Sequence, residues 1–251
     1  MNKVLVIGAN GGIGNQVVGQ LLDEGYGVIG TYSHQSNLIE KFSDNVNYHT
    51  IQLDISDSTA IKQLADAMTN ENKVLYGVVN CSGIVGFEGS SIDTDIDIWK
   101  KTLDINLTGN FLLGKLFYPL IAENGRFVMI SSTDAYFGGA ITAAYAASKS
   151  GVNSLTKSFS LLFSNKKIRV NAIAPGWVMT PMTEPNGRDF LDKVAAINPL
   201  KRIASPNDIA NLVQFLLSDK ADYVNGQTIT VDGGYTNQDP TLMLEEDTKV
   251  K

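Results

Sequence analysis

The chain has 251 residues, a length that fits one large α/β domain or two small ones. Hydrophobic residues make up 43% of it and charged residues 18%, so it can bury a sizeable core and is not disordered. The formal net charge is −6 and the basic residues are scattered, which argues against nucleic acid or an anionic membrane as a partner. One cysteine and two histidines exclude a disulfide framework and a usual zinc site, so no metal is expected.

The first apolar run, residues 3–7, is too short for a signal peptide or a membrane span, so we expect a cytoplasmic protein. Similar runs recur along the chain. They predict strands at residues 3–7, 26–32, 46–53, 74–80, 126–131, 167–173 and 227–231. Most of these runs are nearly continuous in apolar residues, which is typical of strands covered on both faces.

Apolar residues at helical spacing lie between the predicted strands, at 13–22, 61–68, 152–162 and 209–217. Ser205, Pro206 and Asp208 predict a capping box at the start of the last helix. The alternation indicates an α/β fold, a single doubly wound Rossmann domain with a seven-stranded parallel sheet and helices on both faces. We assign it residues 1–235. Residues 236–251 form a polar, acidic C-terminal tail, for which a solvated end is favoured over a subunit-interface arm.

The first predicted strand runs into a glycine-rich turn, "VIGANGGIG" at residues 6–14. Gly8, Gly12 and Gly14 allow a tight turn that presents backbone N–H groups, at a helix N-terminus, to a pyrophosphate. Their spacing, G-x-x-x-G-x-G, is not the usual dinucleotide fingerprint. A plain tight turn therefore remains an alternative.

Polar residues stand at the ends of two later strands. Asn80 and Gly83 belong to "VVNCSG" and Ser132 to "VMISSTDAY", and a further candidate, Asn106, lies in "LDINLTGNF". Ligands of parallel sheets bind outside the carboxyl ends of the strands, where such groups can hydrogen-bond a substrate. Taken singly, each of these residues can equally satisfy backbone groups of its own fold.

Tyr145 and Lys149 in "AAYAASKSG" are four residues apart, which places both side chains on one face of a helix. A tyrosine with its ordinary pKa of about 10 is a poor acid–base catalyst at neutral pH, and a nearby ammonium stabilises the phenolate. Alone, the pair also arises by chance.

These motifs occur together and in a fixed order: Gly8, Gly12, Gly14, Asp54 in "LDIS", Asn80, Gly83, Asn106, Ser132, Tyr145, Lys149, "NAIAPGWVMTPM" and "YVNGQTITVDGG". The set resembles the classical short-chain dehydrogenase/reductase family, in its 3-oxoacyl-carrier-protein reductase-like branch. The resemblance covers the chain from residue 3 to about residue 235. It implies an NAD(P)-dependent enzyme that acts on CH–OH or C=O groups.

The resemblance also implies roles for individual residues. The cofactor-binding residues it implies are Gly8, Asn10, Gly11, Gly12, Ile13 and Gly14 at the pyrophosphate, Tyr32 and Ser33 at the adenine ribose, Asp54 and Ile55 at the adenine, Asn80, Cys81, Ser82 and Gly83 on the adenosine side, and Pro175, Gly176, Val178 and Thr180 at the nicotinamide, with Tyr145 and Lys149. Tyr145 is implied as the general acid of carbonyl reduction. Lys149 would lower its pKa and bind the nicotinamide ribose. Ser132 would position the substrate oxygen, and Asn106 would hold a helix kink and a relay water.

Three positions depart from the family pattern. Ile7 stands where the family often has a threonine, which removes a hydroxyl that helps tie the turn to the Asn80 region. Cys81 and Ser82 replace the second asparagine and the alanine of the usual "NNAG". None of these changes touches the residues of the proton chemistry.

NADP(H) is favoured as the cofactor, and NAD(H) remains possible. Tyr32, Ser33 and His34 follow the second predicted strand, where NAD-specific relatives carry an acidic residue. Without a carboxylate a 2′-phosphate is not repelled, and Ser33 can donate to it. Gly11, however, stands where a basic residue often marks NADP.

The substrate expected is a small-molecule carbonyl or alcohol, either a 3-oxoacyl compound or a smaller or sugar-like ketone. Its pocket is expected among Trp177, Tyr136, Phe137, Met179 and Met182, under a mobile segment after Thr180. A catalytically silent cofactor-binding regulatory or scaffold protein is the alternative. The resemblance further implies a homo-oligomer, a tetramer or dimer, although the apolar faces in "NFLLGKLFYPLI" and "LTKSFSLLF" can also be buried within one subunit.

Overall fold

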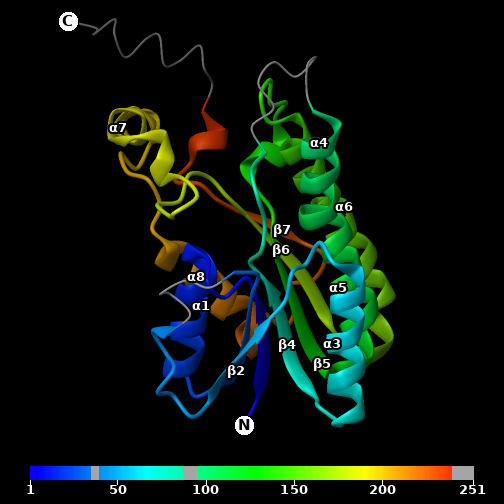
Figure 1. Cartoon of the computed structure of the whole chain (residues 1–251). Coiled ribbons are helices and arrows are strands. Elements are labelled where there is room, and N and C mark those ends of the chain that lie inside the picture. Colours follow the sequence, from blue (N-terminus) through cyan, green and yellow to red (C-terminus); the bar gives the residue numbers. More distant parts are fainter. Residues whose placement is uncertain (35–39, 87–94, 239–251) are drawn as a thin grey trace, which may run out of the picture.

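In the computed structural model, a parallel sheet lies between two layers of helices (Figure 1). The structure describes residues 1–34, 40–86 and 95–238, so residues 239–251 of the predicted tail lie outside the described part of the chain. Within these residues seven strands pair in the order β3-β2-β1-β4-β5-β6-β7. They are β1 (Lys3–Ile7), β2 (Gly27–Tyr32), β3 (Tyr48–Gln52), β4 (Leu75–Asn80), β5 (Ile121–Ile130), β6 (Arg169–Pro175) and β7 (Thr228–Val231). The predicted fold class is confirmed.

Six strands begin and end within two residues of their predicted bounds, and β5 is the exception. It begins at Ile121, which pairs with Leu75, and the ladder shifts register between Leu75 and Gly77. Asn124 takes a left-handed φ of 57° in this first part of the strand. The polar residues at this point interrupt the apolar run, so the sequence predicted the strand only from residue 126, and the pairing with β4 extends it.

The helices are α1 (Gly12–Asp23), α3 (Ser58–Asn70), α4 (Ile96–Leu103), α5 (Gly109–Phe117), α6 (Ala143–Leu162), α7 (Arg188–Ile197) and α8 (Pro206–Leu217). Helices α1 and α8 pack on one face of the sheet, and α3, α5 and α6 cover the other (Figure 1). The predicted capping box of Ser205 and Asp208 is present at the start of α8. None of the helices in the described ranges combines the length and the apolar character that crossing a bilayer requires.

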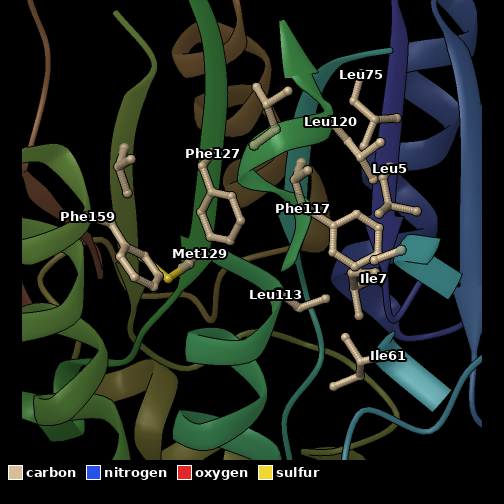
Figure 2. Close-up of a cluster of buried hydrophobic side chains, with 14 of the residues drawn as sticks. Leu5, Ile7, Ile61, Leu75, Leu113, Phe117, Leu120, Phe127, Met129 and Phe159 are labelled. Atoms are coloured by element: carbon tan, nitrogen blue, oxygen red, sulfur yellow. The ribbon is translucent and has the colours of Figure 1, made fainter. Parts of the chain in front are cut away.

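The sheet is buried on both faces, which explains the unbroken apolar runs of its strands. In β1, Leu5 and Ile7 face the layer of α3, α5 and α6, whereas Val4 and Val6 face α1 and α8. Figure 2 shows the first of these two clusters, in which aromatic rings from α5, α6 and β5 fill the space over the sheet. Leu162, predicted on the buried stripe of α6, is instead 65% exposed, because the neighbouring Phe163 at the end of the helix occupies the core and is 4% exposed.

Candidate active site

The carboxyl ends of four neighbouring strands meet at one edge of the sheet. Ile7 at the end of β1 pairs with Asn80 at the end of β4, and Asn80 pairs with Met129 of β5. Ile130 in turn pairs with Ile173 near the end of β6. The segments that follow these strands, which contain the predicted cofactor and catalytic residues, therefore begin side by side, at the edge where parallel α/β sheets bind ligands.

The glycine-rich turn needs glycine for reasons internal to the fold. Gly8 has a φ of 74°, and a Cβ there would lie 2.9 Å from the backbone nitrogen of Ser82, beyond β4. A Cβ on Gly14 would overlap the carbonyl oxygen of Gly8. The turn that results leads directly into α1, whose N-cap is Gly11; no side chain of the described residues caps it, and no acidic residue lies in its first turn. These N–H groups suit an anion such as a pyrophosphate.

Residues from two other loops flank the turn. The Asn10 side chain donates to the carbonyl oxygen of His34, at 2.9 Å, so the segment after β2 lies beside it. On the other side, a Cβ on Gly12 would lie 2.8 Å from the methyl group of Thr180. The structure thus brings together the predicted pyrophosphate, ribose and nicotinamide positions, three segments far apart in the sequence.

The predicted adenine positions, Asp54 and Ile55, follow β3. The Asp54 carboxylate accepts hydrogen bonds from the backbone nitrogen and hydroxyl of Ser56, at 2.9 and 2.7 Å, and these bonds lower its pKa. Ile55 is only 6% exposed and packs against Gly109 of α5. The strand before them is held to β2, since the backbone nitrogen of Leu53 donates to the carbonyl oxygen of Tyr32.

Two of the positions that depart from the family pattern, Ile7 and Cys81, lie next to each other in the structure, at the ends of β1 and β4. The backbone nitrogen of Gly8 donates to the hydroxyl of Thr31 at 3.4 Å, so a threonine of β2 contacts the turn although residue 7 is isoleucine. The backbone nitrogen of Cys81 donates to the carbonyl oxygen of Ile7 at 2.9 Å. Burial raises the pKa of the Cys81 thiol to about 12, so it is a neutral side chain at pH 7.

At the other predicted cofactor contacts, the backbone itself fixes the position. The backbone nitrogen of Gly176, after Pro175 of β6, donates to the carbonyl oxygen of Val231 in β7. Val178 is 5% exposed and forms an isolated bridge with Ala204. This anchoring carries the chain from β6 towards the glycine-rich turn.

The catalytic candidates Ser132, Tyr145 and Lys149 come from the end of β5 and from α6. The Lys149 ammonium is buried, donates to the carbonyl oxygen of Ile130 at 2.9 Å and lies 5.5 Å from the centre of the Tyr145 ring. The Ser132 hydroxyl accepts from the backbone nitrogen of Asp134 at 3.1 Å and is also hydrogen-bonded with Tyr145. This arrangement can hydrogen-bond a substrate oxygen and hold a proton beside it.

Burial dominates the electrostatics of Tyr145 and Lys149. It raises the pKa of Tyr145 to about 12, opposed by a hydrogen bond with Ser132 and reinforced by the charge of Asp134. Burial also lowers the pKa of Lys149 to about 8. The expected lowering of the Tyr145 pKa by Lys149 stays a prediction.

Asn106 lies in a π-helical turn, Asp104–Thr108, between α4 and α5, at the point where a helix kink was expected. Its side chain accepts from the backbone nitrogen of Ile84 and donates to the carbonyl oxygen of Ile84, both at 2.9 Å, and to the hydroxyl of Ser148 at 3.1 Å. A Cβ on Gly83 would lie 3.3 Å from both the Asn106 side chain and the Lys149 ammonium. The end of β4 is thereby packed directly against the catalytic candidates.

Asn110 is a residue that the sequence analysis missed. Its side chain accepts from the Asn80 side chain at 2.8 Å and donates to the carbonyl oxygen of Asn106 at 2.7 Å. Asn80, Asn106 and Asn110 are each at most 1% exposed, so these bonds form without competing water. The available signal was an asparagine inside the otherwise apolar run "GNFLLG" of α5, where a buried amide requires partners.

The expected substrate side is open in comparison. Tyr136, Phe137, Met179 and Met182 are between 42% and 50% exposed. Trp177 packs edge-on against Phe190 of α7, with ring centres 5.3 Å apart, and Gly187 with a φ of 81° begins that helix. These side chains are available to a substrate because they bury little of their surface within the fold.

The chain matches known proteins over nearly its whole length. The family model described as enoyl-(acyl carrier protein) reductase matches residues 8–236. A cis-4-hydroxycyclohexanecarboxylate dehydrogenase of Sinomonas cyclohexanicum is 32% identical over 92% of this chain and 95% of its own length. A 3-oxoacyl-[acyl-carrier-protein] reductase of Staphylococcus epidermidis is 33% identical over 93% and 99%.

Solved structures agree with these sequence matches. A short chain dehydrogenase family protein from Francisella tularensis has a TM-score of 0.85 and 32% identity, and the match covers 95% of this chain and all of that one. The structure of ElxO with NADP bound has a TM-score of 0.84 and 26% identity, over 94% and 99% of the two chains.

Proposed function

Because this chain belongs to the short-chain dehydrogenase/reductase family, we propose that it reduces a ketone, 3-oxo or sugar-like carbonyl to a secondary alcohol with NADPH, with Tyr145 as proton donor. Its relatives are named dehydrogenases and reductases, and the chain is an oxidoreductase that acts on CH–OH or C=O groups. The observation that carries the proposal is the position of Ser132, Tyr145 and Lys149 beside the glycine-rich turn, at one edge of the sheet.

Tyr145 is the proposed proton donor. Burial raises its pKa to about 12, so the phenol is protonated at neutral pH but is a weak acid, and it can give its proton only to an oxygen on which strong negative charge develops. The hydrogen bond with Ser132 lowers this pKa and so favours the transfer. The Ser132 hydroxyl, whose oxygen is already engaged by the backbone of Asp134, donates to the same substrate oxygen and polarises the carbonyl. Lys149, held at Ile130, returns a proton towards Tyr145 and binds the ribose of the cofactor.

The residues around the turn fit a dinucleotide. The uncapped start of α1 and the glycine backbone would hold the pyrophosphate, and the bound nicotinamide supplies the hydride. NADP(H) is proposed over NAD(H) because Tyr32, Ser33 and His34 place no carboxylate at the ribose position, and because ElxO, a structural neighbour, binds NADP. Comparison of the NADPH and NADH affinities tests this choice, and a clear preference for NADH would overturn it.

A homo-oligomer, a tetramer or a dimer, is proposed from the exposed apolar side of α5 and α6. Phe111 is 46% exposed, and Leu161 and Leu162 are 76% and 65% exposed. A hollow lined by Leu107, Phe111 and Leu155 lies between the two helices. Light scattering after size-exclusion chromatography should give a multiple of the chain mass, and Phe111→Glu should shift it towards the monomer.

Substitution of Tyr145 provides the central test. We expect NADPH-dependent turnover of ketones to fall at least about a hundredfold in Tyr145→Phe, because general acid catalysis contributes about two to four orders of magnitude. Tyr223→Phe, at a fully exposed tyrosine, is the matched control and should retain the wild-type rate. A protein that binds NADPH without any turnover that Tyr145→Phe abolishes would instead be a regulatory or scaffold protein of the same fold.

A further inference from the structure

Asp134 introduces a carboxylate into the catalytic cluster. It follows Ser132 in the short 3₁₀ turn Thr133–Tyr136, and its backbone nitrogen donates to the Ser132 hydroxyl at 3.1 Å. The turn is fastened to α6, since the Ser150 hydroxyl donates to the carbonyl oxygen of Ala135 at 2.9 Å. The position of Asp134 relative to Ser132 and to α6 is therefore fixed by the backbone.

The Asp134 carboxylate lies close enough to both Tyr145 and Lys149 for its charge to act on them. Burial raises the pKa of Asp134 and the Lys149 ammonium opposes this rise, while the Asp134 carboxylate raises the pKa of both Tyr145 and Lys149. The carboxylate and the ammonium thus favour each other's charged form.

The Asp134 side chain is half-buried, yet within the described ranges no hydrogen bond reaches its carboxylate oxygens. Two other aspartates near the sheet edge have donors: Asp54 accepts from Ser56, and Asp232 accepts from Gly234 and Thr236. A half-buried carboxylate without a protein donor loses hydration that only a bound molecule or water can replace. Its place beside Ser132 and Tyr145 makes the substrate the natural donor.

Charge decides which substrates this arrangement accepts. A substrate carboxylate or phosphate next to the reacting carbonyl would lie near the Asp134 carboxylate, and two like charges close together repel each other. A hydroxyl group at the same place can donate to it, and hydrogen bonds to charged acceptors are the strong ones. An alkyl group does neither.

We propose that Asp134 binds a hydroxyl group of the substrate adjacent to its carbonyl and makes the enzyme selective for neutral hydroxyketones over keto acids. This inference rests on the proposed carbonyl reduction. A residue that acted only by positioning Tyr145 would affect all ketones equally, so substrate selectivity is the readout that separates the two roles.

The test uses three ketones that share an acetyl group: hydroxyacetone, butanone and pyruvate. The other group on the carbonyl carbon is a hydroxymethyl in hydroxyacetone, an ethyl in butanone and a carboxylate in pyruvate. We expect kcat/KM with NADPH to fall in the order hydroxyacetone, butanone, pyruvate. In Asp134→Asn the ratio of hydroxyacetone to butanone should drop about tenfold, the value of one charged hydrogen bond, and the ratio of pyruvate to butanone should rise about tenfold.

Asp66→Asn is the matched control, because it removes an exposed carboxylate on α3, away from the cluster. It should leave both ratios as in the wild type. Unchanged ratios in Asp134→Asn would overturn the inference even where turnover depends on Tyr145.

A binding measurement separates this failure from failure of the proposed function. In the presence of NADP⁺, Tyr145→Phe protein should bind hydroxyacetone about tenfold more tightly than butanone by titration calorimetry, and the double variant with Asp134→Asn should lose this preference. If the Tyr145→Phe protein prefers hydroxyacetone but the wild-type enzyme turns over no ketone, only the proposed carbonyl reduction is contradicted. Equal affinities would contradict the role of Asp134.

Discussion

The cofactor side and the substrate side of the site are built in different ways. Around the glycine-rich turn, backbone segments pack so closely that no Cβ fits between them: Gly8 packs against Ser82, and Gly14 packs against Gly8. On the substrate side, Phe137 and Met182 are about half exposed and contribute little to core packing. The first region tolerates almost no added atom, whereas the second can change its side chains at little structural cost. This contrast explains how relatives about a third identical to this chain are named for different substrates.

The largest effect is expected where the backbone is most crowded. Gly14→Ala would place a methyl group on the carbonyl oxygen of Gly8, so the turn must move. We expect the binding free energy of NADPH to weaken by about 3 kcal/mol, which lowers the affinity about a hundredfold; fluorescence titration measures this change. In Gly138→Ala, beside Phe137 on the substrate side, the added Cβ has no atom within 4 Å, so the NADPH affinity should stay unchanged. Equal effects of the two variants would remove the proposed contrast between the regions.

Lys149 lies between the two regions, and its burial should be visible in stability. Burial lowers its pKa from the ordinary 10.5 to about 8, so holding the ammonium in the folded protein at pH 7 costs on the order of 3 kcal/mol. Lys149→Met removes this cost and one hydrogen bond to Ile130. We therefore expect its unfolding free energy at pH 7 to rise by about 1–3 kcal/mol, while NADPH affinity and turnover fall.

The pH dependence supplies the control for Lys149. The unfolded lysine binds its proton up to about pH 10 and the folded one only up to about pH 8, so folding releases a proton in this window. Wild-type stability should consequently rise with pH between these values, relative to Lys149→Met. The raised pKa of Tyr145 acts only above its ordinary value of 10, where stability falls as pH rises further. A parallel pH dependence of the two proteins would contradict the buried charge.

The same contrast explains what the sequence could reveal. The apolar runs predicted the sheet, and Ser205, Pro206 and Asp208 predicted the start of α8. The glycine spacing and the Tyr145–Lys149 pair each left an alternative open, and they indicated one site only through their joint occurrence and order along the chain. The start of β5 depends on pairing with β4, and the pKa of Tyr145 depends on burial, so neither is visible in a local pattern. Substrate residues on exposed turns carry no pattern at all.

Asn110 tests whether the cofactor side is also held together by buried amides. Asn110→Leu keeps a side chain that branches at Cγ but leaves the Asn80 amide without its acceptor, which should cost about 1–3 kcal/mol of stability. Because Asn80 leads directly to the backbone that meets Gly8, KM for NADPH should rise more than KM for the ketone. Asn211→Leu, an exposed amide of α8 that accepts from Gln20, should change stability by less than about 0.5 kcal/mol. A loss of stability with unchanged NADPH binding would confine Asn110 to a structural role.

The smallest structural effect is expected at Phe137. The ring is 50% exposed, so Phe137→Ala should change the unfolding free energy by no more than about 0.5 kcal/mol. The same small change is expected for the control Val46→Ala, at an 85% exposed site. NADPH affinity should stay at the wild-type value, because the turn around Gly8 is untouched. The ratio of kcat/KM for a bulky ketone to that for butanone should nevertheless shift by about tenfold to a hundredfold, since a ring that contacts substrate contributes about 1–3 kcal/mol of discrimination. A shift in NADPH affinity with no shift in this ratio would assign Phe137 to the cofactor side and break the division between the two regions.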